Sequence, residues 1–215
     1  VLFVKKDKTH QGYMWVVVDP RTRNTYFEYR EGRNRAGPRL MLKDFQGKVQ
    51  SDGYVVYDVI DAELSDIDHY NCWTHARRKF IEALTDNKAV CEHALTLIQK
   101  LYEVEAGCRN DNCSLDERYE RRQTYSLPIL ESLKEWMDQQ ALVITPGCPT
   151  GKAIAYCNRR WTNLIKYANT GNVEIDNNLV ENAIRPLALG RKNYLFAGGH
   201  DAAVNIGYYY TVFST

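Results

Sequence analysis

The sequence predicts an α/β fold in which a long α-helical segment is inserted between strand-containing parts of the chain. Runs rich in β-branched and aromatic residues at 12–19 and 24–30 are typical of strands. Shorter runs at 47–52 and 68–72 indicate two further strands. Residues 87–168 instead carry apolar residues at helical spacing and few strand signals. Since 44% of the 215 residues are apolar and 26% are charged, we expect a globular chain with a real core.

The first two strands are expected to form a hairpin. Asp19 and Pro20 stand between them, and an Asp before Pro at a strand exit is ordinary turn chemistry, so we assign Asp19 to a turn and not to a catalytic site. The apolar start, residues 1–4, is assigned no helix or strand, and its abruptness indicates the cut end of a fragment. Pro38 favours a short helix over 38–45, because its missing amide hydrogen costs nothing in a first turn.

The third strand, over 47–51, is expected to be buried and to end at Asp52, which Gly53 follows. This arrangement lifts a carboxylate to the rim of a sheet, where the backbone approaches phosphate closely. A plain Asp-Gly turn without chemistry is the alternative. A helix is expected to start directly behind it, at 54–58.

The strand over 68–72 is expected to lead into a helix over 73–84. Cys72 and His75 form a Cys-x-x-His pair at its start, but no second pair stands at the usual zinc spacing, so we disfavour a metal site there. His75 is interpreted as structural or phosphate-orienting. Three basic residues that follow it are candidate DNA-binding residues: Arg77, Arg78 and Lys79.

The inserted segment is predicted to form three amphipathic helices, within 90–104, 130–137 and 154–168. Few strand signals interrupt them, so the segment must fold back on itself as an α-helical insertion. We therefore divide the chain into three parts: residues 1–86 as the first part of a core, 87–168 as the insertion, and 169–215 as the C-terminal part of the core.

The helix predicted over 178–187 concentrates polar chemistry. Glu181 and Arg185, four residues apart, place a carboxylate and a guanidinium side by side on one face. A capping box formed by Asn178 and Glu181 is the alternative, although the density of polar groups favours a functional role. A last helix is predicted over 200–210. The helix over 178–187 is expected to be buried through one apolar face, formed by Leu179, Val180, Ala183, Ile184 and Leu187.

The formal net charge is only +1, but the basic residues are clustered. Besides the cluster at 77–79, Arg191 and Lys192 are candidate DNA contacts, and a solvated face is the alternative for each cluster. Six cysteines lack Cys-x-x-Cys spacing, and nothing resembles a signal peptide or a run of eighteen apolar residues. These features predict a cytoplasmic protein with free thiols and no membrane partner.

Several segments resemble one family of enzymes. The strongest is IDNNLVENAIRP at 175–186, followed by ALGRKNYLFAG at 188–198, and KDFQGKVQSDGY at 43–54 and CWTHARRKF at 72–80 support it. All are similar to segments of transposases of the IS66 family, in the same order along nearly the whole chain. The resemblance implies a ribonuclease H-like mixed sheet flanked by helices, which carries an Asp, Asp, Glu metal triad.

Asp52 matches the second acid of that triad and Glu181 the third, so the resemblance implies that both are catalytic metal ligands. The first acid of the family lies in an Asp-Glu-Thr segment, which we expect upstream of Val1. On this expectation the part before residue 87 lacks its first strand, and the fragment by itself is inactive. The second-shell or phosphate-binding candidates are His75, Asn178 and Arg185.

The chemistry implied by the family is phosphoryl transfer on DNA. Carboxylates would hold two Mg²⁺ or Mn²⁺ ions, one activating water or a 3′-hydroxyl and the other stabilising the leaving oxygen. The implied partners are double-stranded DNA, as element ends and target, and further copies of the chain in a homo-oligomer. Two alternatives remain: a hydrolytic nuclease of the same fold that cuts without joining, and a non-catalytic DNA-binding remnant of a decayed element.

Overall fold

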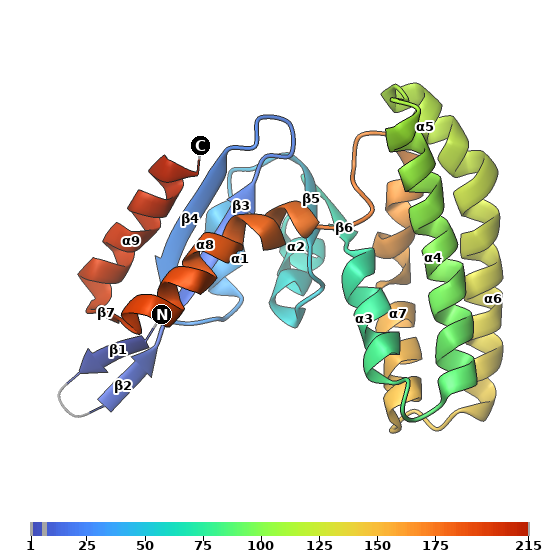
Figure 1. Cartoon of the computed structure of the whole chain (residues 1–215), viewed down its shortest axis with the longest axis horizontal. Helices are drawn as coiled ribbons and strands as arrows, with labels where there is room; N and C mark the ends of the chain where they lie inside the picture. Colours follow the sequence, from blue (N-terminus) through green and yellow to red (C-terminus); the bar gives the residue numbers. More distant parts are fainter. Residues whose placement is uncertain (1, 6–7, 215) are drawn as a thin grey trace. The chain divides into compact units, whose positions relative to one another are not determined.

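The computed structural model describes residues 2–5 and 8–214, with side chains from residue 10 onward (Figure 1). The chain forms two compact units, each described here by itself. The first comprises Val1–Phe45, Val55–Ser65 and Asn178–Thr215, and the second comprises Gln46–Tyr54 and Asp66–Asn177.

The first unit contains a small three-stranded sheet in the order β2-β1-β7. Strand β1 (Leu2–Lys5) pairs antiparallel with β2 (Lys8–Gln11) and parallel with β7 (Phe196–Gly198). The expectation that the start of the chain carries no strand is therefore wrong. Strands β1 and β2 are only four residues long, and the second partner of β1, β7, lies at the other end of the sequence, so the local signal was too short to predict a strand.

The predicted hairpin is confirmed in the same unit. Strands β3 (Tyr13–Val18) and β4 (Thr25–Arg30) pair antiparallel. Asp19 serves the turn between them, as expected, because its carboxylate accepts hydrogen bonds from the Arg21 backbone amide and the Thr22 hydroxyl, both at 3.0 Å.

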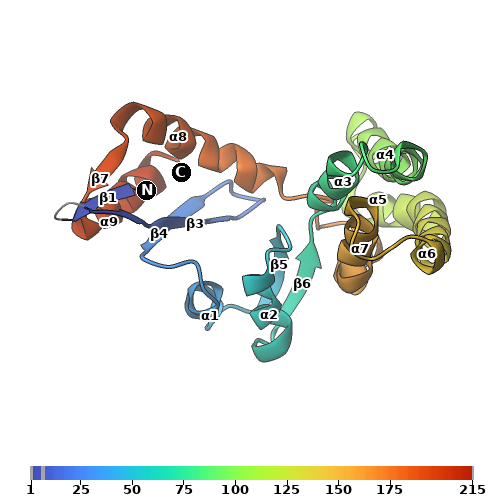
Figure 2. The same ribbon diagram turned by 90° about the horizontal axis from the view of Figure 1, so that it is seen from below.

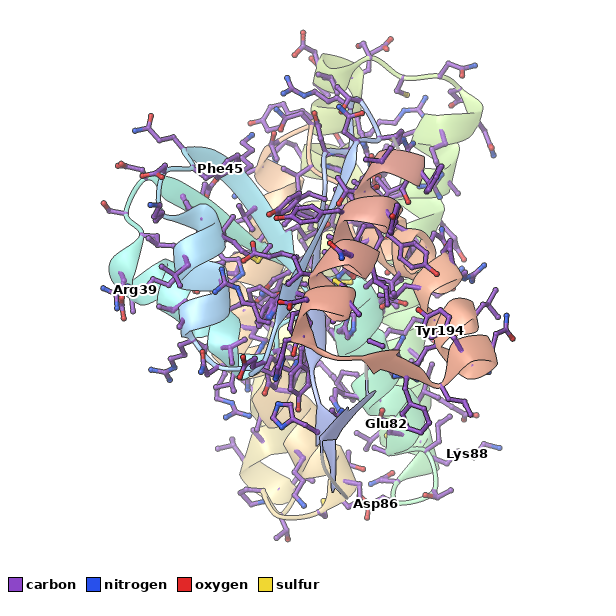
Figure 3. All side chains as sticks on the ribbon, turned by 90° about the vertical axis from the view of Figure 1, so that its left-hand side faces the viewer. Arg39, Phe45, Glu82, Asp86, Lys88 and Tyr194 are labelled. Carbon is purple, nitrogen blue, oxygen red and sulfur yellow. The ribbon has the colours of Figure 1, made fainter. Side chains whose placement is uncertain are left out.

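Five helical segments complete the first unit. Helix α8 (Asn178–Tyr194) packs against β3, and α9 (His200–Phe213) packs against β4. Helix α1 (Ala36–Leu42) carries Arg39, which is labelled in Figure 3, and this residue pairs with Glu63 at 3.2 Å. The remaining segments are a 3₁₀ turn at Val55–Tyr57 and α2 (Asp58–Glu63). These positions confirm the helices predicted near residues 38, 54, 178 and 200.

The second unit begins with two parallel strands. Strand β5 (Gly47–Ser51) pairs with β6 (Ile67–Asn71), and Ser51 lies opposite Asn71. Both strands were predicted, but the expectation that β5 is buried is wrong. Its first two residues are exposed and only Ser51 is buried, because β5 has one described partner strand and lies at the edge of a two-stranded sheet.

The rest of this unit is helical, and Figure 2 views its long helices nearly end-on. Trp73 is fully buried at the start of α3, and its indole Nε1 donates to the Leu164 carbonyl of α7 at 2.9 Å. Asp86, labelled in Figure 3, accepts hydrogen bonds from the Thr150 amide at 3.0 Å and hydroxyl at 2.6 Å, at the start of α7. The helices are α3 (Trp73–Glu82), α4 (Lys88–Asn110), α5 (Leu115–Arg121), a π-helical turn (Arg122–Ser126), α6 (Leu127–Val143), α7 (Pro149–Ile165) and a 3₁₀ turn (Lys166–Asn169).

Helix α5 was not predicted, because none of its residues is buried and it carries no apolar periodicity. The sequence nevertheless holds a signal for its start. Ser114 accepts from the Glu117 amide and Glu117 accepts from the Ser114 amide, which is a capping box with the spacing that marks helix starts.

These findings confirm the α/β class and the three predicted helices of the inserted segment. The described strands lie in three separate small sheets and not in one mixed sheet. The ribonuclease H-like arrangement and the division at residues 86 and 168 stay predictions. All six cysteines lack a disulfide partner, as expected. No described helix combines the length and apolar character needed to cross a bilayer.

A buried ion network ties the helices of the second unit together. Glu105 of α4 and Arg122 are both fully buried, and the guanidinium donates two hydrogen bonds of 2.7 Å to the carboxylate. Arg122 also donates to the Tyr167 carbonyl at 2.8 Å. Arg118 of α5 bridges Glu105 to Glu174, and its hydrogen bonds hold the pKa of Glu174 below its ordinary value.

We predict that Glu105→Gln lowers the free energy of unfolding by about 3–5 kcal/mol, because it leaves buried positive charge without its counter-charge. Urea denaturation measures this loss. Glu103→Gln, an exposed position on the same helix, is the matched control and should change stability by less than about 0.5 kcal/mol. Equal effects at the two positions would contradict the network's role.

Candidate functional site

Asp52 stands directly after β5, at the carboxyl end of the parallel pair. Its side chain is half-buried, and Oδ1 accepts a hydrogen bond from the Tyr54 backbone amide at 2.8 Å. Within the described residues this is the one hydrogen bond found to the carboxylate. Asp52 is therefore a turn residue and also presents a carboxylate at a strand end, so the two interpretations of the sequence are compatible.

The turn that carries Asp52 is held by two side chains of α7. The Tyr156 hydroxyl donates to the Asp52 carbonyl at 3.1 Å, and Arg160 donates through Nε and Nη2 to the Gly53 carbonyl at 2.9 and 2.5 Å. The guanidinium also lies over the Tyr156 ring, 4.5 Å from its centroid. Sequence reasoning missed both residues, since their partners lie more than 100 positions away.

Gly53 is required by this geometry. Its φ of +72° is a conformation that side chains disfavour, and a Cβ would lie 2.5 Å from the Tyr156 hydroxyl and 2.8 Å from Arg160 Nε. Only a glycine allows α7 to approach the backbone this closely.

A buried polar cluster lies behind the turn. The Ser51 hydroxyl is hydrogen-bonded to His69 Nε2 at 2.8 Å, and the Asn163 amide lies 3.3 Å from His69 Nδ1. Ser51 is 4% exposed and His69 2% exposed, so no substrate reaches them. This cluster, which sequence reasoning also missed, supports the end of β5 and β6.

Cys72 and His75 flank the start of α3. The Cys72 thiol is buried and accepts a hydrogen bond from the Asn177 amide at 3.4 Å, and burial raises the pKa of this thiol to about 11. His75 is half-buried on α3. Among the described residues, no group of three His, Cys, Asp or Glu side chains is arranged to hold a metal ion.

The segment that precedes α8 is fixed to the ends of both strands. Gln50 of β5 donates to the Glu174 carbonyl at 2.8 Å, and the Trp73 amide donates to the Ile175 carbonyl at 3.1 Å. The Thr74 hydroxyl donates to the Asp176 carboxylate at 3.2 Å. These contacts hold the segment within the second unit up to Asn177, the last residue of that unit, whose amide donates to Cys72.

Glu181 lies in the first turn of α8, as expected, with a half-buried side chain. Asn178 and Arg185 on the same helix are exposed. The expectation of a fully buried apolar face is wrong for this unit: only Leu187 is buried, and the other four apolar residues of the stripe are half-buried. Since Asp52 belongs to the second unit and Glu181 to the first, their sharing of a metal site stays a prediction.

The predicted DNA-binding residues lie on helix surfaces. Arg77 and Arg78 are exposed on α3, and Lys79 pairs with Glu82 at 3.0 Å. Arg191 and Lys192 are exposed in the last turn of α8. Exposure leaves these cations accessible to a polyanion, although the pairing of Lys79 reduces the charge of its cluster.

We predict that Gly53→Ala destabilises the chain by about 1–3 kcal/mol, because alanine must adopt a strained positive φ and its Cβ overlaps the side chains from α7. Thermal or urea unfolding measures the loss. Gly147→Ala is the matched control, since no atom lies within 4 Å of the Cβ that would be added there, and it should be neutral within about 0.5 kcal/mol. A neutral Gly53→Ala would show that α7 does not hold the turn.

Comparisons with known proteins give one consistent family. A family model described as "Transposase IS66 family" matches residues 1–205. The uncharacterized protein y4jD of Sinorhizobium fredii (strain NBRC 101917 / NGR234) is 30% identical over an alignment of 177 positions, which covers 79% of this chain and 34% of that protein. The uncharacterized protein y4hP of the same organism is 29% identical over an alignment of 234 positions, which covers 98% of this chain and 42% of that protein. The chain thus spans about a third to two fifths of these relatives, and no solved structure matches it significantly.

Proposed function

Because the chain belongs to the IS66 family of transposases, we propose that it forms part of the catalytic region of a transposase that cuts and joins DNA by metal-dependent phosphoryl transfer. The observation that carries the proposal is Asp52. Its carboxylate follows a parallel strand, sits in a turn that α7 holds, and is half-exposed in a segment that the family model matches. A site that transfers phosphoryl groups needs such a carboxylate in a fixed orientation.

The donor chemistry of Asp52 and Glu181 fits a hard divalent cation. Carboxylate oxygens are the ligands that Mg²⁺ and Mn²⁺ prefer, and Asp52 accepts one described hydrogen bond, so its carboxylate retains capacity for a metal. When bound, such ions supply a Lewis acid that activates the attacking hydroxyl and stabilises the leaving oxygen. We assign Asp52 and Glu181 the role of holding them.

The remaining candidates are assigned to DNA. Arg185, one helical turn beyond Glu181, is proposed to pair with a phosphate or to orient that carboxylate. His75 and Asn178 are proposed as second-shell or phosphate-binding residues. The cations at 77–79, Arg191 and Lys192 are proposed to contact the DNA backbone, which sets position and affinity more than sequence preference.

The test of this function uses the entire reading frame that encodes the chain, with Mg²⁺ and DNA carrying the element ends. We predict joined products that Asp52→Asn and Glu181→Gln each reduce to background, whereas Asp44→Asn, an exposed aspartate close in sequence, leaves them unchanged. The 215-residue chain alone is expected to give neither nicks nor joined products. Nicks without joining would favour a hydrolytic nuclease, and DNA binding without any cleavage would favour a non-catalytic remnant.

We predict that the chain binds DNA weakly and without sequence preference, with an affinity that falls steeply as salt rises. Replacing Arg77, Arg78 and Lys79 together with Ala should lower the slope of log affinity against log salt by up to about 3, since each phosphate contact contributes about 0.9. Fluorescence anisotropy at several salt concentrations measures the slope. Lys134→Ala, which removes a cation paired with Asp138 on α6, should leave it unchanged. Affinity that does not depend on salt would contradict the assignment.

A further inference from the structure

The turn at Asp52 has more support than an ordinary surface turn. One hydrogen bond, from the Tyr54 amide to the Asp52 carboxylate, is enough to form an Asp-Gly turn. Here the two carbonyls that follow the Asp52 side chain also accept hydrogen bonds from α7: the Asp52 carbonyl from Tyr156 and the Gly53 carbonyl twice from Arg160. On the other side of Asp52, the Ser51 carbonyl accepts from the Cys72 amide at 3.1 Å.

The two residues of α7 act as one unit. They are four positions apart and therefore lie on the same helical face, where the Arg160 guanidinium stacks on the Tyr156 ring. Ordering an arginine side chain costs conformational entropy. Stacking and two hydrogen bonds from a charged donor offset that cost, and together they make the guanidinium a rigid support for the Gly53 carbonyl.

A second contact to the turn comes from the end of strand β5. The Ser51 hydroxyl, bonded to His69, lies 3.4 Å from the Gly53 amide. The peptide between Asp52 and Gly53 is therefore confined from the α7 side and from the strand side. Asp52 itself is half-exposed, whereas its neighbours Ser51 and Gly53 are buried.

We propose that Tyr156 and Arg160 are positioning residues for Asp52: they hold the two carbonyls that follow its side chain, so that its carboxylate meets a divalent cation in one orientation. The inference rests on the proposed function, since it takes Asp52 as a metal ligand. It gives the inserted helices a direct part in the site, because α7 lies between the two proposed acids in sequence. Partners that orient a ligating carboxylate commonly contribute 10–100-fold to metal affinity.

The first experiment measures how often the turn at Asp52 opens in the 215-residue chain. Hydrogen exchange of the Tyr54 amide, read by NMR, reports opening of the turn because this amide donates to Asp52. Arg160→Gln should speed its exchange about tenfold or more, and Tyr156→Phe, which removes one neutral hydrogen bond, about two- to tenfold. Arg159→Gln, the exposed neighbour on the same helix, is the matched control and should change nothing. An unchanged exchange rate in both test variants overturns the proposal.

The second measurement asks whether the support matters for the cation. Mn²⁺ binding is measured on the product of the entire reading frame carrying the same substitutions, by electron paramagnetic resonance of the free ion. It should weaken about tenfold in Arg160→Gln and less in Tyr156→Phe, while melting temperatures stay within a few degrees of wild type. Arg160→Lys retains one charged donor and should recover part of the affinity. Mn²⁺ binding that Asp52→Asn weakens but Arg160→Gln leaves intact overturns the positioning role alone. If Asp52→Asn binds Mn²⁺ as wild type does, the proposed function of Asp52 fails, and this inference fails with it.

Discussion

The buried carboxylate of Glu105 is the constraint on which the second unit depends. A charge that is fully buried must be paired and hydrogen-bonded, and two arginines from later parts of the chain satisfy it. One of them, Arg118, continues the network to Glu174, while the other, Arg122, also binds the backbone carbonyl of Tyr167. The network thereby holds Tyr167, at the end of the helical segment, and Glu174, in the stretch that leads to α8. One ion cluster thus helps to position this stretch.

Two hydrogen-bonded systems then connect the helical segment to the candidate site. Arg118 holds Glu174, whose own carbonyl accepts from Gln50 on β5, and α7 holds the turn at Asp52. Each system joins residues that lie more than fifty positions apart in sequence. The helices between the two proposed acids are consequently part of the structure around Asp52, and their removal would leave the Asp52 and Gly53 carbonyls without their hydrogen bonds from α7.

Local pattern was enough to predict most elements, and non-local pairing explains the failures. The β3–β4 hairpin and the long helices have strong periodicity, so they were predicted. Strand β1 was missed because it is only four residues long and one of its two partners, β7, lies at the opposite end of the chain. Asp52 was found from its residue type, its glycine neighbour and a family resemblance, whereas Arg160 was not, because an arginine four residues after a tyrosine on a helix gives no sign of the distant carbonyl that it binds.

Asp52 differs in solvent exposure from the polar cluster next to it, which resembles a catalytic triad. Ser51 and Asn163 lie within hydrogen-bonding reach of the two ring nitrogens of His69, and the three are the residue types of a nucleophilic triad. Yet the serine and the histidine are buried behind the turn, so their hydrogen bonds stabilise the strand ends and cannot meet a substrate. Asp52, the next residue, is half-exposed and carries a carboxylate suited to a hard cation. Accessibility therefore favours phosphoryl transfer assisted by a metal-binding carboxylate over serine chemistry at this strand end, in agreement with the family to which the chain belongs.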